Sequence, residues 1–178
     1  MNTFVNEEPP SRLLLLMRHG KADMAGSTDS ERELTDRGVT QARLVGEYLA
    51  SQGIHPSKVL VSPSARTRGT WEALQETLAE SDADVSILDD LYLGGLGDTL
   101  EAIRQVDDQH RVVLVVAHEP TMSRAAAFLA NEDASETSSL AQVRIGVPTG
   151  SMSVLTSSAD SWQDLNEASL VLHTLVRS

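Results

Sequence analysis

Three short segments of the chain are apolar at nearly every position and are bounded by polar residues. Such runs are typical of strands buried on both faces, which occur in parallel sheets covered by helices. The pattern therefore predicts a covered, mostly parallel sheet. The three segments are RLLLLM at 12–17, KVLV at 58–61 and RVVLVVA at 111–117.

The segments between these strands place apolar residues at helical spacing. The first predicted helix has a one-sided apolar stripe over residues 39–49, with Thr35 as its N-cap and Gly53 as its stop. The second is predicted to start at Ser62 as N-cap, with Pro63 in the first helical position.

Two further helices are predicted in the second half of the chain. Asp98 and Glu101 have the spacing of a capping box at the start of a third helix, and a fourth follows the His-Glu-Pro sequence at 118–120. Beyond residue 140 the pattern changes to short β-like runs, which predict the remaining strands, some of them at the sheet edge. These runs are AQVRIGV at 141–147, SMSVLT at 151–156 and SLVLHTLV at 169–176.

Strands that alternate with helices predict an α/β fold. We expect a three-layer sandwich in which helices cover both faces of a mostly parallel central sheet. The length of 178 residues and the hydrophobic fraction of 40% suit a single domain, which we assign to residues 12–178. Residues 1–11 contain two prolines and two glutamates, and we interpret them as a flexible N-terminal tail.

Composition restricts the classes of partner and chemistry. The chain has 26 Asp and Glu against 14 Lys and Arg, so a general affinity for nucleic acid or an anionic membrane is not expected. It has no cysteine, which excludes disulfides and thiolate chemistry and favours a cytoplasmic location. The apolar run at 13–17 is too short to span a bilayer.

Nitrogen-rich side chains follow the predicted strands at their carboxyl ends, where open α/β sheets bind ligands. Arg18 and His19 end the first strand, and His118 ends the strand at 111–117. Arg66 falls in the opening turn of the second predicted helix, where free backbone N–H groups and the helix dipole favour an anion. Folding should therefore gather two arginines and two histidines at one rim of the sheet.

This set of residues suits phosphoryl transfer. Two guanidinium groups can hold a phosphoryl group through paired hydrogen bonds, and an imidazole can attack phosphorus to form a covalent intermediate. Gly20 would let the backbone turn tightly after His19. Because the neighbouring arginines repel a cation and no ligand spacing is visible, we expect no metal and no other cofactor.

Three motifs resemble those of the histidine phosphatase superfamily, whose fold is phosphoglycerate mutase-like. They are RHG at 18–20, SPxxRxxxT at 62–70 and AHEP at 117–120, and the resemblance covers roughly residues 12–130. The short length and the segment DSERELTDRG at 29–38 are most similar to the SixA-type phosphohistidine phosphatase branch.

The resemblance implies a role for each matching residue. His19 would be the nucleophile that becomes phosphorylated, and Arg18 and Arg66 would bind the phosphate. His118 would be the second histidine of the pocket, and Arg32 a further substrate contact. The implied partner is a phosphorylated protein, for a SixA-like role a histidine phosphotransfer domain.

The chain departs from the superfamily at the usual general acid, because Leu93 occupies the place where many members have a carboxylate. An imidazole leaving group, with a pKa of about 6.5, needs far less protonation than an alkoxide, so the departure favours phosphohistidine as substrate. The nearby acids that could substitute are Asp90, Asp23, Glu119 and Asp98.

Alternatives to this hypothesis remain open. The chain could be a phosphatase of small phosphorylated molecules with the same fold, or a non-catalytic module that binds phosphate or a phosphoprotein. A zinc hydrolase using His19 and His118 is a third class, which activity in the presence of EDTA would exclude.

Overall fold

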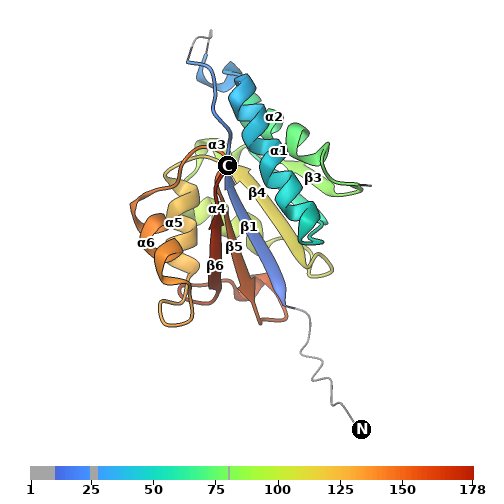
Figure 1. Cartoon of the computed structure of the whole chain (residues 1–178). Helices are drawn as coiled ribbons and strands as arrows, with labels where there is room; N and C mark the ends of the chain where they lie inside the picture. Colours follow the sequence, from blue (N-terminus) through green and yellow to red (C-terminus); the bar gives the residue numbers. More distant parts are fainter. Residues whose placement is uncertain (1–10, 25–27, 80) are drawn as a thin grey trace.

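The computed structural model describes residues 11–24, 28–79 and 81–178, so the predicted tail lies, apart from Ser11, outside the described residues. Its centre is a six-stranded sheet in the order β3-β2-β4-β1-β5-β6 (Figure 1). Neighbours among β3, β2, β4 and β1 are parallel, whereas β5 is antiparallel to both β1 and β6. The strands are β1 Arg12–Arg18, β2 Lys58–Val61, β3 Asp84–Ile87, β4 Val112–Ala117, β5 Met152–Ser157 and β6 Val171–Val176.

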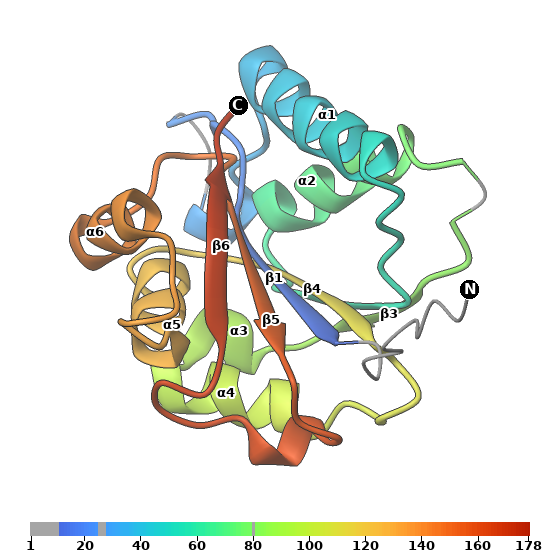
Figure 2. The ribbon, with the colours of Figure 1, turned by 60° about the horizontal axis from the view of Figure 1, so that its bottom comes forward.

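Helices cover both faces of this sheet, which confirms the predicted three-layer α/β sandwich. Helices α1 and α2 lie on one side, and α4, α5 and α6 lie on the other (Figure 2). The helices are α1 Asp36–Ser51, α2 Ala65–Gln75, α3 Asp90–Leu93, α4 Leu96–Arg104, α5 Thr121–Leu129 and α6 Thr137–Ile145, and the 3₁₀ helices are η1 Asp29–Glu31 and η2 Trp162–Asp164. No helix among the described residues has the length and apolar character needed to cross a membrane.

A hydrophobic core lies on each face of the sheet, and strand β1 contributes to both because its side chains alternate between the two faces. Leu14 and Leu16 join the core beneath α4, α5 and α6, whereas Leu15 and Met17 join the core beneath α1 and α2. All four side chains are at most 1% exposed. The apolar run before the RHG motif is therefore the structural reason why that motif stands at a fixed point in the middle of the sheet.

Helix α1 confirms its predicted boundaries. The Thr35 hydroxyl accepts a hydrogen bond from the Gly38 backbone N–H at 3.1 Å, and Gly53 has a φ of 66° just past the end.

The predicted starts of the next two helices were wrong. Helix α2 begins at Ala65 with Ser64 as its N-cap, because the backbone N–H of Ser62 still bonds to the sheet at Val116. Helix α4 begins at Leu96, and Asp98 is its third residue, whose carboxylate accepts a hydrogen bond from the Gly95 N–H at 3.0 Å.

The predicted strand at 141–147 was also wrong, because residues 137–145 form helix α6. Val143, Ile145 and Val147 occupy alternate positions, as apolar residues do in a half-buried strand, but Ile145 is 86% exposed. The residues that α6 buries include Leu140 and Val143, which are three positions apart as on a helix face. Strand β3 was not predicted, because it is an edge strand with mostly exposed residues.

Gly20 is required for a reason that differs from the prediction. Its φ is not positive, but a Cβ there would lie 2.6 Å from the Gly38 carbonyl oxygen. A Cβ on Gly38 would lie 2.2 Å from the Lys21 carbonyl oxygen. The two glycines therefore let the turn after β1 pack directly against the start of α1.

Candidate active site

The carboxyl ends of β1, β2 and β4 meet at one open hollow of about 520 Å³. All five residues predicted as site residues line it, although they are widely separated along the chain. Its described lining consists of Arg18, His19, Asp29, Arg32, Arg66, Tyr92, Leu93, His118 and Glu119.

His19 is held at the end of β1 with one ring nitrogen committed to the backbone. The backbone N–H of His19 donates to the Ala117 carbonyl, and the backbone carbonyl of His19 accepts from the Gly150 N–H. Ring atom Nδ1 lies 2.7 Å from the Gly20 carbonyl oxygen. A carbonyl oxygen only accepts, so Nδ1 carries the proton and Nε2 keeps its lone pair in the neutral ring.

His118 follows β4 and is the second ring of the pocket, with its centroid 5.4 Å from that of His19. Its Nδ1 faces Arg66 Nη2 at 3.4 Å, and its Nε2 lies 2.7 Å from the Ser62 hydroxyl oxygen. Because a guanidinium only donates, Nδ1 accepts and Nε2–H donates to Ser62. Ser62, predicted as a helix cap, instead orients this ring.

Both histidines are neutral at pH 7. Burial is the main cause that lowers the pKa of His19 to about 4, and the charges of Arg66 and Arg18 lower it further, against the opposing effect of the bond to Gly20. Burial likewise lowers the pKa of His118 to about 4, followed by the charge of Arg66.

We expect the two histidines to titrate together near pH 4, because these causes act on both rings. The expected folded pKa lies below that of about 6.5 for an unfolded histidine, so the unfolded chain binds protons first as the pH falls. Stability should then decline between about pH 6.5 and pH 4. NMR titration of the ring Cε1–H signals, assigned with the His19→Ala variant, measures the two pKa values directly. Titration midpoints near 6.5 would contradict the expectation.

The two predicted phosphate-binding arginines each have a buried Nε with no hydrogen-bond partner among the described residues. Arg18 uses Nη1 to bond to the Val147 carbonyl at 2.8 Å. Arg66 is 6% exposed in the first turn of α2. A buried N–H without a partner costs free energy, so these two atoms indicate a place for an anionic ligand.

Arg32 lies at the rim of the same hollow, but each of its nitrogens has a protein partner. Nε donates to the Asp23 carbonyl at 2.8 Å, Nη1 to the Asp29 carboxylate at 3.0 Å, and Nη2 contacts Met24 Sδ at 3.3 Å. Its predicted contact with substrate stays a prediction.

Asp29 and Tyr92 are site residues that the sequence interpretation missed. The Tyr92 hydroxyl donates to Asp29 Oδ2 at 2.6 Å, and this bond, followed by those from Arg32 and Arg66, holds the pKa of the Asp29 carboxyl well below its usual range. The Tyr92 ring centroid lies 5.5 Å from that of His118. Asp29 begins the segment DSERELTDRG, but neither residue was assigned a role, because the two meet only in the folded chain.

Three of the four acids suggested as replacements for the missing general acid are not among the residues that line the active-site hollow. Asp90 and Asp98 line a different hollow, beside α3 and α4, and Asp98 is committed to its helix start. Asp23 is not among the residues that line the active-site hollow, although its carbonyl holds Arg32. Leu93 does line the hollow and is 78% exposed, so its position is open to a substrate.

Glu119 is the fourth suggested acid and lies in the hollow, but backbone donors hold its carboxylate. Oε1 accepts from the Ser123 N–H at 2.7 Å and Oε2 accepts from the Val147 N–H at 3.1 Å. The carboxylates among the described lining residues are those of Asp29 and Glu119, and both are engaged by the protein.

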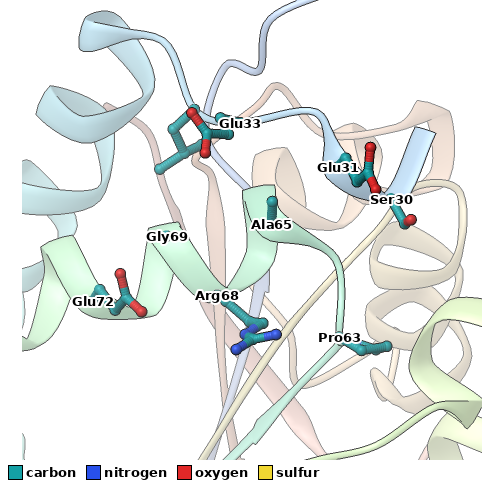
Figure 3. A pocket seen from close by; sticks show the side chains of 9 residues that line it. Ser30, Glu31, Glu33, Pro63, Ala65, Arg68, Gly69 and Glu72 are labelled. Carbon is teal, nitrogen blue, oxygen red and sulfur yellow. The ribbon is translucent and has the colours of Figure 1, made fainter. Parts of the chain in front are cut away.

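A neighbouring hollow of about 640 Å³ lies between η1 and α2 (Figure 3). As far as the chain is described, the charged residues that line it are Glu31, Glu33, Glu72 and Arg68, and no histidine does. Helix α2 thus presents Arg66 to one hollow and Arg68 to the other. The residue types for phosphoryl chemistry gather only in the smaller hollow of the two.

Comparisons with known proteins agree with this fold and site. The family model of the histidine phosphatase superfamily (branch 1) matches residues 14–94. The phosphohistidine phosphatase SixA of Escherichia coli is 31% identical over 118 residues, which cover 65% of this chain and 73% of that protein. An uncharacterized protein of Mycobacterium tuberculosis is 32% identical over 152 residues, which cover 84% of this chain and 91% of that protein.

A solved structure assigned as phosphohistidine phosphatase SixA, from Nakamurella multipartitia, superposes with a TM-score of 0.84. It is 29% identical and the match covers 96% of this chain and 98% of that one. The fold and the site thus define a phosphatase. More particularly, the chain belongs to the histidine phosphatase superfamily, with SixA proteins among its relatives.

Proposed function

We propose that the protein removes phosphate from phosphohistidine on a partner protein, through transient phosphorylation of His19. The observation that supports this most is the combination in one hollow of three groups: a histidine whose neutral ring has a lone pair on Nε2, and two arginine Nε donors without a partner in the described part of the chain. The lack of an uncommitted carboxylic acid among the described lining residues points to a leaving group that needs little protonation.

In the first step, His19 Nε2 attacks phosphorus and forms a new N–P bond. The bond from phosphorus to the substrate's ring nitrogen breaks, and that nitrogen takes the electron pair. Because the other nitrogen of the substrate ring carries a proton, the leaving group is a neutral imidazole. Arg18 and Arg66 donate to the phosphoryl oxygens as charge spreads over them in the transition state. His118, whose ring centroid lies 5.4 Å from that of His19, accepts from Arg66 Nη2 and so helps to hold this arginine beside the attacking nitrogen.

In the second step, water attacks the phosphorus of phosphorylated His19. The N–P bond breaks, orthophosphate leaves with the oxygen and both protons of that water, and the lone pair returns to Nε2. No residue of this chain is needed to protonate a strongly basic oxygen in either step.

The proposed substrate is a cytoplasmic phosphoprotein, of which a histidine phosphotransfer domain is the specific candidate. Two relatives are described as phosphohistidine phosphatases, and the hollow is open at the rim of the sheet rather than enclosed. A ring carried on the surface of another protein can reach such a site without unfolding either partner.

We expect kcat/KM for a phosphohistidine peptide to exceed that for glycerol phosphate by at least about 100-fold, because an alkoxide needs a proton donor that the site lacks. The measurement is release of orthophosphate from each substrate under the same conditions. Equal rates, or faster hydrolysis of glycerol phosphate, would refute the proposed substrate class.

A matched pair of variants tests the reason for this preference. Leu93→Glu introduces a carboxyl group at an exposed position in the hollow, and Leu93→Gln introduces the same shape without an acid. Only the Leu93→Glu variant should hydrolyse glycerol phosphate faster than the unchanged protein.

A further inference from the structure

Asp29 contacts three other side chains of the hollow, and it has no predicted role, although it begins the segment DSERELTDRG at 29–38. We propose that Asp29 is a positioning residue, which holds one edge of the Arg66 guanidinium so that the opposite edge is presented to the phosphoryl group. This inference rests on the proposed function of the site, since it concerns how Arg66 meets phosphate.

Arg66 and Asp29 are joined at two points. The Asp29 backbone carbonyl accepts from Arg66 Nη1 at 2.7 Å, and the Asp29 carboxylate Oδ2 accepts from Nη2 at 3.1 Å. A planar guanidinium cannot rotate while both Nη atoms are held in this way. Side chain and backbone of one residue thus fix the orientation of the arginine.

The remaining edge of Arg66 consists of Nε and the second hydrogen of Nη2. Nε is buried and has no partner among the described residues, and Nη2 faces His118 Nδ1 at 3.4 Å. This edge therefore points to the side of the hollow where the histidines lie. A phosphoryl group on this side would bond to Nε, next to the Nη2 that donates to His118 Nδ1.

The same carboxylate ties further elements to this arrangement. Asp29 Oδ1 accepts from Arg32 Nη1 at 3.0 Å, and Oδ2 accepts from the Tyr92 hydroxyl at 2.6 Å. One residue on η1 thus connects α2, α3 and the loop that carries Arg32. Losing the carboxylate would loosen one wall of the hollow without touching β1 or His19.

The charge of Asp29 has an effect opposite to its geometry. It cancels one of the three positive charges of Arg18, Arg32 and Arg66, and so weakens the attraction of the hollow for a phosphate dianion. Replacing Asp29 with a neutral residue strengthens that attraction, but it leaves the Arg66 guanidinium less well oriented toward the phosphoryl group. The chemical step depends on the orientation of the Arg66 guanidinium, whereas ground-state binding depends more on charge. The rate of the chemical step and the affinity for phosphate should therefore change in opposite directions.

The test compares Asp29→Asn with the unchanged full-length protein, using p-nitrophenyl phosphate as substrate and inorganic phosphate as inhibitor. We expect kcat to fall by about 10-fold or more, while the inhibition constant of phosphate stays the same or becomes lower. Asp29→Glu keeps the charge on a longer side chain, so its kcat should lie between that of Asp29→Asn and that of the unchanged protein. The melting temperature of each variant shows whether it is folded.

Glu33→Gln is the matched control, because Glu33 is an exposed acid four residues along the same segment and outside the active-site hollow. It removes the same charge and should leave kcat unchanged. Unchanged kcat in Asp29→Asn would overturn the inference. So would a parallel loss of kcat and phosphate affinity, which a merely structural role predicts.

Failure of the proposed function would look different. If the unchanged protein hydrolyses p-nitrophenyl phosphate but never carries phosphate on His19, the proposed mechanism is wrong. The comparison with Asp29→Asn would still report whether Asp29 orients the Arg66 guanidinium.

Discussion

Replacing His19 with alanine is expected to lower kcat by about 10⁴-fold or more, the loss typical of removing a nucleophile. Nε2 of His19 has a lone pair in the neutral ring, because Nδ1 donates its proton to the Gly20 carbonyl at 2.7 Å. His118 does not replace it, since Arg66 faces its Nδ1 and Ser62 accepts from its Nε2. Steady-state hydrolysis of p-nitrophenyl phosphate in a buffer with EDTA gives the rate.

Rapid quenching of a single turnover with ³²P-labelled phosphohistidine peptide tests the covalent step itself. The unchanged protein should carry an acid-labile label, and the His19→Ala variant should carry none. His55→Ala is the control, because His55 is exposed and outside the hollow, and it should label normally. A protein that turns over the peptide without ever carrying label would rule out the intermediate, and no turnover at all would favour a binding module.

Replacing Arg66 with lysine is expected to lower kcat/KM by about 10²- to 10³-fold, although the positive charge is retained. An ammonium group lacks the planar fork, so it cannot bond to Asp29 through two nitrogens and also present a second edge to phosphate. The steady-state parameters for p-nitrophenyl phosphate measure this loss. Most of it should appear in kcat.

Helix α2 itself offers the matched control for this substitution. Arg68 stands two positions further on, is exposed, and lines the neighbouring hollow instead. Arg68→Lys should leave kcat/KM within about 2-fold of the unchanged value. Since Arg66 is buried, the melting temperature of Arg66→Lys is needed as well; a folded variant with nearly full activity would show that the guanidinium is dispensable.

The position of the site could be predicted because it depends on strand ends. The apolar runs at 12–17 and 111–117 must pair inside the sheet, and this places Arg18, His19 and His118 at one rim. Arg66 was located by its place in the first helical turn after β2, even though the predicted helix start was two residues too early. Local pattern and topology together were sufficient for these four residues.

The contacts that organise Arg66 could not be predicted in the same way. Asp29 lies 37 positions from Arg66 and 63 from Tyr92, so only tertiary packing brings them together. Local periodicity also failed for α6, where Val143 and Ile145 alternate like strand residues. A glutamate cap at Glu136 and the burial of Leu140 outweigh that alternation.

The two sides of the hollow rest on elements of very different local stability. The backbone of His19 is bonded to Ala117 and Gly150 at the end of an interior strand, whereas Asp29 belongs to η1, a single turn with no buried residue. Segments with few buried contacts open at lower free energy than the sheet does. The anchor of Arg66 can therefore detach in a sub-global fluctuation that leaves His19 protected from hydrogen exchange, and the fraction of molecules ready for turnover follows that local equilibrium rather than the unfolding of the whole chain.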